Sequence, residues 1–310
     1  MESLQQIKGR IKSVKNINQI TKAMELVAAT KMRKSQEIAL ASRPYAFTAL
    51  DFLATLSKLD GVTLPPLLTA REVKRRAVIL VTSDKGLAGS FNSNVIRAFE
   101  KFVKREGDKL AAEHAHFVGV GQKAAQYLEK NMKLCKKFVR VGDYTTVDEV
   151  RPIAELVIDE YLKGNWDEVI IFSAHFKNAL QQDVIERRVL PVTIEDIKKT
   201  LKEIVPVTGR FSDIHEPEHA SHNGLRDYLI EPSAGEILSD LARHLILMQI
   251  YHVILEANAS EHAARRLAMK NASDNAEDLA GGLTLAYNKS RQASITREII
   301  EIVAGAESLK

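Results

Sequence analysis

The sequence is poor in cysteine and lacks a long apolar run. Its 310 residues include a single cysteine, Cys135, which excludes an intrachain disulfide bond and a cysteine-based zinc site. No segment approaches the roughly 18 uncharged apolar residues that a membrane-spanning helix needs. Residues 1–30 mix charged and apolar positions, so no secretory signal is expected. A reducing compartment is therefore the default environment for this chain.

Proline is also scarce, and its placement divides the chain. None of the eight prolines lies before Pro44 or after Pro232. Because proline breaks the interior of a helix, both ends of the chain can form long helices. We therefore predict an N-terminal coiled-coil helix over residues 1–60, a C-terminal coiled-coil helix over 233–310 that pairs with it, and a domain of mixed α/β structure over 61–232.

The N-terminal segment has the start signal and the spacing of a long helix. Ser3 and Gln6 form a capping box, in which each side chain accepts a hydrogen bond from the other residue's backbone N–H. Apolar residues then recur at intervals of three and four, close to a heptad seam, with Thr21 as an interruption. We expect this helix to end near Asp60-Gly61. The stripe consists of Leu4, Ile7, Ile11, Val14, Ile17, Met24 and Val27.

The C-terminal segment repeats this pattern over a greater length. Ser233 and Glu236 form a second capping box. About 75 helical residues span roughly 113 Å, against roughly 87 Å for about 58 residues at the N-terminus. If the two helices pair antiparallel, part of the C-terminal helix therefore projects alone. Its stripe runs through Ile237, Leu241, Leu245, Met248, His252, Leu255, Ala259 and His262, then Met269, Ala276, Leu279, Leu283, Ala286, Ala293, Ile299 and Val303.

Strand and helix patterns alternate in the middle of the chain. A strand–helix–strand rhythm of this kind is typical of a mainly parallel sheet with helices packed on it, so we predict a Rossmann-like α/β domain over 61–232. The polar segment 206–224 is expected to be a loop. The expected strands are 76–83, 114–120, 137–141, 167–174, 183–192 and 226–230, and the expected helices are 92–105, 121–132 and 148–163.

Positive charge is concentrated at the N-terminus. The formal net charge of the chain is +4. Residues 1–45 carry a net charge of +6, residues 46–232 balance, and residues 233–310 carry −2. A basic segment of this kind suits a nucleic acid, an anionic surface or an acidic partner helix.

Two glycine-rich turns resemble phosphate-binding motifs. Gly119–Ala124 fits a dinucleotide fingerprint between a strand and a helix, and Asp143 follows near the end of the next strand. The alternative is a tight turn that binds nothing. Ser83–Asn92 could cradle a phosphate at a helix N-terminus, but it lacks the Gly-Lys-Ser/Thr of a P-loop, which disfavours Walker-type hydrolysis. A structural turn, capped by Ser90 or Asn92, is the favoured interpretation.

The histidines and the single cysteine form no clear catalytic or metal-binding motif. His215–His219 matches the H-E-x-x-H string, but Pro217 disfavours the helix that a zinc protease needs. His252 and His262 lie on the apolar stripe and are expected to be packed histidines rather than ligands. Cys135 has no visible His/Asn constellation, so it is not assigned as a nucleophile. The sequence thus predicts no catalytic residue, no cofactor and no metal ligand.

Several motifs resemble the gamma subunit of F-type ATP synthase. They are QITKAMELVAA over residues 19–29, SDKGL over 83–87, ASEHAAR over 259–265 and YNKSRQASIT over 287–296. They cover both ends and the middle of the chain in the order of that family. Ala88-Gly89 replaces the usual Cys-Gly, and the regulatory cysteine pair of the chloroplast form is absent, which excludes that thiol switch.

The resemblance implies a rotor shaft that is not catalytic on its own. It implies a subunit of the proton-transporting two-sector ATP synthase, turning inside a ring of alpha and beta subunits. The foot of the shaft would grip the epsilon subunit and the membrane c-ring. The lack of an Arg/Ser-rich leader favours a bacterial chain, peripheral on the cytoplasmic side of the inner (plasma) membrane. By resemblance, the rotor–stator contacts are Lys22, Met24, Arg265, Gln292 and Thr296.

Two other functions are compatible with parts of the sequence. A coiled-coil protein could bind nucleic acid through the basic N-terminal helix, although that helix lacks interleaved aromatic residues. An oxidoreductase could use Gly119–Ala124 to hold a dinucleotide. The resemblance favours a rotor subunit that binds neither nucleic acid nor a cofactor.

Overall fold

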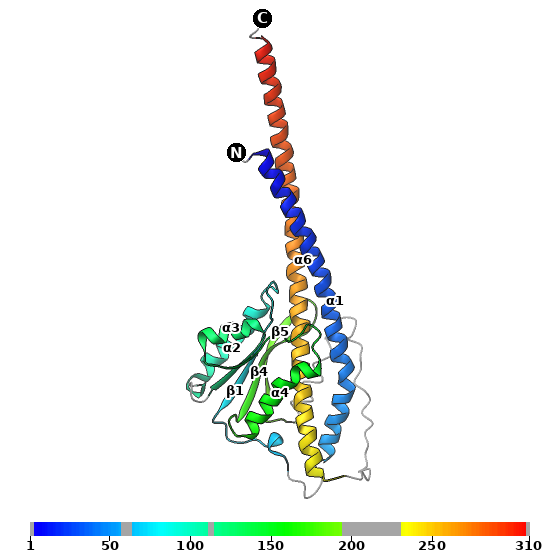
Figure 1. Cartoon of the computed structure of the whole chain (residues 1–310), viewed down its shortest axis with the longest axis vertical. Coiled ribbons are helices and arrows are strands. Elements are labelled where there is room, and N and C mark those ends of the chain that lie inside the picture. The colour runs from blue at the N-terminus through cyan, green and yellow to red at the C-terminus, as the bar shows by residue number, and fades with distance from the viewer. Residues whose placement is uncertain (1–2, 57–63, 111–114, 194–230, 308–310) are drawn as a thin grey trace. The chain divides into compact units, whose positions relative to one another are not determined.

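The structure is a computed structural model that divides into two compact units (Figure 1). One unit combines Met1–Ala28 with Arg265–Lys310, and the other spans Ala29–Ala264. The predicted loop 206–224 with its His215–His219 motif, the predicted strand 226–230 and the predicted helix end at Asp60-Gly61 lie outside the described residues. The described residues are 3–56, 64–110, 115–193 and 231–307.

Both long helices form as predicted. They are α1 (Leu4–Leu56) and α6 (Ala234–Glu307), and each contributes to both units. The capping box at the start of α1 is complete, because the N–H of Gln6 donates to Ser3 Oγ (3.2 Å) and the N–H of Ser3 donates to Gln6 Oε1 (2.9 Å). α1 continues through Pro44.

The unit Ala29–Ala264 contains a five-stranded sheet with the order β3-β2-β1-β4-β5. Neighbouring strands from β3 to β4 are parallel, and β5 pairs antiparallel with β4, which confirms the prediction of a mainly parallel sheet. The strands are β1 (Arg76–Val81), β2 (Ala115–Val120), β3 (Leu134–Phe138), β4 (Glu168–Phe176) and β5 (Gln182–Leu190).

Strand β3 lies earlier in the chain than predicted. It covers Leu134–Phe138 instead of 137–141. This edge strand exposes Cys135, Lys136 and Lys137, so it lacks the buried apolar run that marks the inner strands. Lysine on an edge strand discourages pairing with another chain, at the cost of a weak strand signal in the sequence.

Helices cover both faces of the sheet, and the long helices form part of one layer (Figure 1). One face packs against α2 and α3 through Val95, Phe99 and Leu128. The other packs against α4, α1 and α6 in a continuous aliphatic core that includes Leu53 and Leu245. The helices are α2 (Phe91–Glu106), α3 (Gln122–Asn131) and α4 (Val147–Leu162), with short 3-10 helices η1 (Pro66–Leu68) and η2 (Gly107–Leu110).

In the unit Met1–Ala28 with Arg265–Lys310, α1 and α6 pair antiparallel along a seam of mostly small residues (Figure 1). The Ser273 hydroxyl donates to Asn18 Oδ1 (2.7 Å) and fixes which residues face each other. Small side chains let helix axes approach closely, which suits a slender shaft. The buried residues of the seam are Ile7, Thr21, Ala28, Met269, Ser273, Ala276 and Ala280.

The predicted stripe of α1 is only partly the buried seam. Ile17 and Val27 are 51% and 54% exposed, whereas Thr21, predicted to interrupt the stripe, is buried. The Thr21 hydroxyl donates to the carbonyl oxygens of Ile17 and Asn18, both at 3.0 Å, so it is satisfied within its own helix. Apolar spacings of three and four fit two adjacent helix faces equally well, and the pattern alone did not separate them.

Candidate functional site

Three of the five predicted contact residues lie at one level of the helix pair. Counted from the contact between Asn18 and Ser273, Lys22 and Met24 lie about 6–9 Å along α1, and Arg265 lies about 12 Å along α6 in the same direction. Lys22 is exposed and Met24 is half-buried. Arg265 is buried, with 9% exposure. The level therefore offers an exposed lysine, a half-buried methionine and a buried arginine.

The other two predicted residues lie on a part of α6 that extends past α1. From Ser273 to Gln292 the rise is about 28 Å, whereas α1 reaches only about 21 Å from Asn18 to its first residue, Leu4. Gln292 and Thr296 are both exposed. The Thr296 hydroxyl donates to the carbonyl oxygen of Gln292 (2.9 Å), which places the two residues on one face. The predicted projecting segment of α6 is therefore present.

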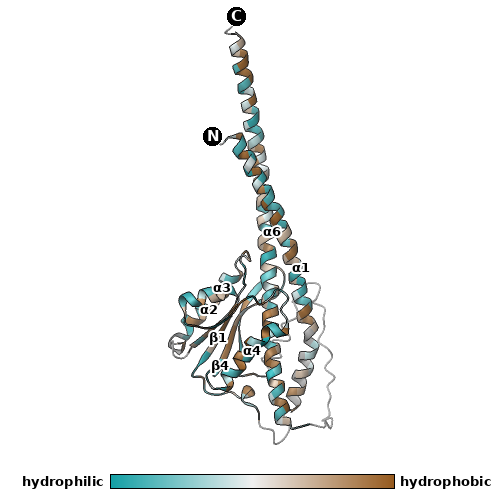
Figure 2. Cartoon of the chain, viewed as in Figure 1, coloured by the Kyte–Doolittle hydropathy of each residue, from teal (hydrophilic) through white to brown (hydrophobic). Residues whose placement is uncertain are grey.

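This projecting end of α6 is rich in apolar residues (Figure 2), and several of their large side chains are exposed. No part of α1 is available to cover them, because α1 begins at Leu4. Leu279, on the predicted stripe, is 51% exposed as well, so that stripe is not a continuous buried seam. Contiguous exposed apolar surface marks an interaction site. The residues at the end of α6 are Ile295 (48% exposed), Ile299 (55%), Ile300 (61%), Ile302 (71%) and Val303 (57%).

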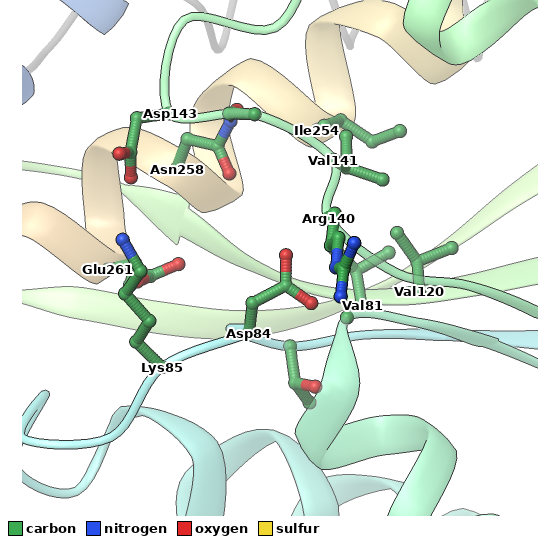
Figure 3. Close-up of a pocket in the computed structure, with 13 residues that line it drawn as sticks. Val81, Asp84, Lys85, Val120, Arg140, Val141, Asp143, Ile254, Asn258 and Glu261 are labelled. Carbon is green, nitrogen blue, oxygen red and sulfur yellow. The ribbon is translucent and has the colours of Figure 1, made fainter.

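A cavity of about 380 Å³ lies where β1 and β2 end in the other unit (Figure 3). Asp84 points into it, between Lys85 and Arg140. One oxygen of Asp84 accepts a hydrogen bond from the backbone N–H of Gln122 (2.8 Å), the first residue of α3. A carboxylate thus occupies the helix N-terminus at which a dinucleotide's pyrophosphate would bind.

In the Gly119–Ala124 fingerprint, glycine allows the backbone of the turn to pack closely. Gly121 has φ +89°, and a Cβ there would lie 2.1 Å from the carbonyl oxygen of Thr82. Asp143, the acidic residue that follows the candidate dinucleotide fingerprint, is paired with Lys31 and lies 3.5 Å from Nε2 of His262. These contacts favour the interpretation of Gly119–Ala124 as a structural turn.

The turn after β1 is closed by its own side chains. Asn92 Oδ1 accepts hydrogen bonds from the N–H and the hydroxyl of Ser83, both at 3.0 Å. Leu87 holds a left-handed φ of +62° and is 64% exposed. Asn92 therefore braces the turn from within α2.

A buried polar cluster joins β4, β5 and α6. Glu256 lies 3.3 Å from His175 and 3.5 Å from Arg187. Burial raises the pKa of Glu256, but the charge of Arg187 and the hydrogen bond with His175 outweigh it, so the net shift is downward. Burial lowers the pKa of His252 to about 4. His252 and His262 are both buried, as expected for packed histidines.

The described part of the chain shows neither a metal-binding cluster nor a membrane-spanning helix. Its His, Cys, Asp and Glu side chains form no group of three or more that could hold a metal ion. Among the same residues, no helix is long and apolar enough to cross a membrane.

Sequence comparison matches nearly the whole chain to known proteins. Residues 3–309 match the family described as ATP synthase. The ATP synthase gamma chain of Geotalea daltonii is 39% identical over 310 residues, with 100% of both chains covered. That of Herpetosiphon aurantiacus is 41% identical over 318 residues, covering 100% of this chain and 99% of the relative.

Solved structures agree with this match. A central stalk/c-ring chain of Tetrahymena thermophila mitochondrial ATP synthase has a TM-score of 0.56 and 25% identity, covering 82% of this chain and 99% of its own. A chain from the OSCP/F1/c-ring structure of the Euglena gracilis mitochondrial enzyme has a TM-score of 0.64 and 19% identity, covering 99% and 94%. With its two terminal helices, its mainly parallel sheet and its full-length sequence match, this chain belongs to the ATP synthase gamma chain family.

Proposed function

We propose that this chain is the central rotor shaft of an F-type ATP synthase. In this role it couples proton flow through the membrane sector to ATP synthesis and hydrolysis in the ring of alpha and beta subunits. The chain itself performs no catalysis. The comparisons support this role, since the relatives are gamma chains and the Tetrahymena structure is of the central stalk and c-ring of that enzyme.

The projecting apolar end of α6 is the observation that carries the proposal. Ile295, Ile299 and Ile302 are spaced by four and three residues, so they share one face of the helix. All three are 48–71% exposed. If this face stays in water, each of these side chains forgoes the roughly 1.5–3 kcal/mol that full burial would contribute. A surrounding ring of partner subunits would cover this helix on all sides.

Rotation requires that the shaft be asymmetric. Ile299 and Ile302 present apolar surface, whereas the exposed Arg297 and Glu301 lie on the roughly opposite side of the helix. Each rotor orientation then presents a different surface to a given beta subunit. A shaft can shift a beta subunit between open and closed states only if it contacts the two states differently.

The level of the helix pair that contains Lys22, Met24 and Arg265 contacts the lower part of the ring of alpha and beta subunits. At this level Lys22 is exposed, Met24 is half-buried and Arg265 is buried. The outward lysine suits an acidic, mobile loop of the beta subunit. We propose Lys22, Met24, Arg265, Gln292 and Thr296 as the rotor–stator contacts, as the family resemblance implies.

The sheet-containing part forms the foot of the rotor. We propose the division into a helix over 1–60, a Rossmann-like domain over 61–232 and a helix over 233–310, with the epsilon subunit and the membrane c-ring bound at the foot. The chain then lies peripherally on the cytoplasmic side of a bacterial inner membrane. Nothing in the comparisons favours binding of nucleic acid through the basic N-terminal segment.

Assembly provides the test of this function. The chain is combined with the alpha, beta and epsilon subunits of the same organism and with the membrane sector, in sealed vesicles. We expect ATP-driven proton pumping that disappears when the chain is left out. The matched variant Ile299→Asp/Ile302→Asp, which places charges on the apolar end, should reduce pumping at least tenfold. Pumping that is independent of the chain would refute the proposal, and salt-dependent retention of nucleic acid would favour the alternative.

A further inference from the structure

One carboxylate contacts both long helices in the unit Ala29–Ala264. Asp143, in the loop between β3 and α4, accepts a hydrogen bond at Oδ2 from the Lys31 ammonium group of α1. Its other oxygen, Oδ1, lies 3.5 Å from Nε2 of His262 on α6. Figure 3 shows the Asp143 carboxylate at the edge of the cavity, with the Lys85 side chain extending toward it. The loop is thus held by a charged group to two helices at once.

The backbone and hydroxyl groups around Asp143 extend this attachment. The Asn258 amide donates to the carbonyl oxygen of Gly142 (3.2 Å) and to Thr145 Oγ1 (2.8 Å). The Tyr251 hydroxyl donates to the carbonyl oxygen of Thr145 (3.2 Å), and the Ser35 hydroxyl donates to that of Asp143 (3.5 Å). Three residues of the loop, Gly142, Asp143 and Thr145, therefore contact polar side chains of the long helices, and Asp143 contacts both.

These helix residues are spaced to face one target. Lys31 and Ser35 are four residues apart on α1, so they lie one above the other. On α6, His262 is four residues beyond Asn258 and eleven beyond Tyr251, which is close to three full turns. Each helix thus directs a single stripe of polar side chains to the segment Gly142–Thr145. Most of them are buried or half-buried, so their hydrogen bonds are shielded from water.

Apart from the buried cluster in which Glu256 of α6 meets His175 and Arg187 of the sheet, the remaining contact between the sheet and the long helices is mainly aliphatic. Leu245, Ile246 and Val253 of α6 lie in the same core as Ile79 and Ile171 of the sheet. Apolar burial opposes separation, but it is non-directional and resists sliding only weakly. Hydrogen bonds lose most of their strength when their angle or distance changes. A shift of α6 by one residue, about 1.5 Å with a rotation of about 100°, would break the contacts of Tyr251, Asn258 and His262 with the loop.

The charge state of Asp143 fits this attachment. Burial raises its pKa, but the hydrogen bond from Lys31 and the charges of Lys31, His262 and Lys85 outweigh that effect, and the net pKa is below the ordinary value. The carboxylate therefore remains ionised at neutral pH. Charge-assisted hydrogen bonds are about twice as strong as neutral ones.

We propose that Gly142–Thr145 is a clasp that holds the sheet in rotational and axial register on both long helices, with Asp143 as the positioning residue for torque transfer between them. The clasp is the segment Gly142–Thr145 together with Lys31, Ser35, Tyr251, Asn258 and His262. Its role in torque transfer rests on the proposed rotor function, whereas its effect on register does not.

The single native cysteine allows a direct test of register. Cys135 is exposed on β3, and Lys34→Cys adds an exposed site on α1 in the same unit. Spin labels at these two positions, in the assembled complex with cysteine-free partner subunits, report the distance between sheet and helix. Asp143→Asn removes the charge at constant size, and Asp143→Glu retains it. Glu129→Gln is the control, because it removes an exposed ion pair with Lys137 in the same domain.

The clasp predicts a narrow distance distribution for the parent chain and for Glu129→Gln. Asp143→Asn should broaden the distribution at least twofold, and Asp143→Glu should restore most of the narrow width. If Asp143→Asn does not assemble, Ser35→Ala removes one weaker clasp contact and should broaden the distribution partially. A width that stays unchanged in the assembled variant overturns the proposal, since the aliphatic core and the Glu256 cluster would then set the register without Asp143.

A second measurement tests torque transfer. In vesicles, Asp143→Asn should lower the number of protons pumped per ATP hydrolysed at least twofold, with recovery in Asp143→Glu. A merely structural role would reduce the yield of complex and leave this ratio unchanged, which would overturn the torque part of the proposal. If the parent complex pumps no protons, the rotor function itself fails, and the label distances still decide whether the clasp exists.

Discussion

Arg187 on β5 places Nη1 3.5 Å from Oε2 of Glu256 on α6, with side-chain exposures of only 8% and 5%. The pair therefore joins the sheet to α6 inside the protein, where an unpaired charge is costly. Removing one partner of a buried ion pair typically costs about 3–5 kcal/mol. The pair thus couples the antiparallel edge of the sheet to the long helix.

The first prediction concerns this pair. Arg187→Met should lower the free energy of unfolding by about 3–5 kcal/mol, because Glu256 loses its main counter-charge. Arg187→Met combined with Glu256→Gln should recover much of that loss, because the second change removes the stranded charge. Urea denaturation of the purified chain measures both effects. Equal losses in the single and double variants would show that packing, and not charge, dominates at this site.

The second prediction concerns acid stability through His252. Its pKa is lowered by burial to about 4 in the folded chain. An unfolded histidine has a pKa of about 6.5, so the unfolded state binds the proton first as the pH falls. Stability should therefore decline between about pH 6.5 and pH 4, by about 3 kcal/mol in total. Glu256, whose folded pKa is lowered, adds a separate loss at lower pH as it becomes protonated.

Stability measured against pH for the parent chain and for His252→Phe tests this prediction. The variant should show a flatter curve between pH 6.5 and 4. Identical slopes in the two proteins would mean that His252 is not the group responsible.

Much of the fold could be predicted from patterns within short segments. The absence of proline at both ends predicted α1 and α6, and the capping box of Ser3 and Gln6 marked the start of α1 correctly. The aliphatic runs of the inner strands predicted the parallel sheet. These signals are local, because capping and burial of a strand depend on neighbouring residues. Strand β3 was misplaced because an exposed edge strand carries little apolar pattern.

The contacts that join distant segments could not be predicted in this way. Lys31 and Asp143 are 112 residues apart, and neither stands in a recognisable motif for an ion pair. Asp143 was instead considered as the acidic residue of a dinucleotide fingerprint, because spacing alone does not show which partner a carboxylate meets. The buried seam was similarly ambiguous, since Ile17 and Thr21 both fit a helical repeat. Only the packing of α1 against α6 decides between them.

The third prediction concerns Gly121. A Cβ at this position would lie 2.1 Å from the carbonyl oxygen of Thr82, and the residue has a φ of +89°. Gly121→Ala should therefore destabilise the chain by about 3 kcal/mol or more, since backbone strain and overpacking act together. Gly86→Ala is a suitable control, because a Cβ there meets nothing within 4 Å. Comparable stability of the two variants in urea would contradict the structural role of the glycine turn.

The fourth prediction concerns Met24, at the level of the helix pair that also contains Lys22 and Arg265. Met24 is half-buried beside exposed Lys22, so a second positive charge can reach solvent there. Met24→Lys should loosen the coupling between ATP hydrolysis and proton pumping by altering the contact with an acidic loop of the beta subunit. Met24→Leu, which conserves volume, is the control. Unchanged pumping per ATP in Met24→Lys would indicate that Met24 serves packing alone.

The fifth prediction concerns the polar pair on the projecting part of α6. Gln292→Leu and Thr296→Val should each slow ATP hydrolysis roughly two- to tenfold without preventing assembly, because one hydrogen bond is worth about 0.5–1.5 kcal/mol. Thr296→Ser keeps the hydroxyl that donates to the Gln292 carbonyl and should retain most of the rate. Steady-state ATPase activity of intact complexes is the measurement. Parental rates in both altered complexes would remove the pair from the contact site.

Rotation of the chain inside its assembled complex tests the central claim most directly. Cys135 is exposed on β3, so a bead can be attached there without changing the sequence. With the ring of alpha and beta subunits fixed to a surface, ATP should drive rotation of the bead in one direction, and the rotation should stop when ATP is removed. ATP hydrolysis by the complete complex with a bead that shows only undirected motion would contradict the assignment of this chain as the rotor.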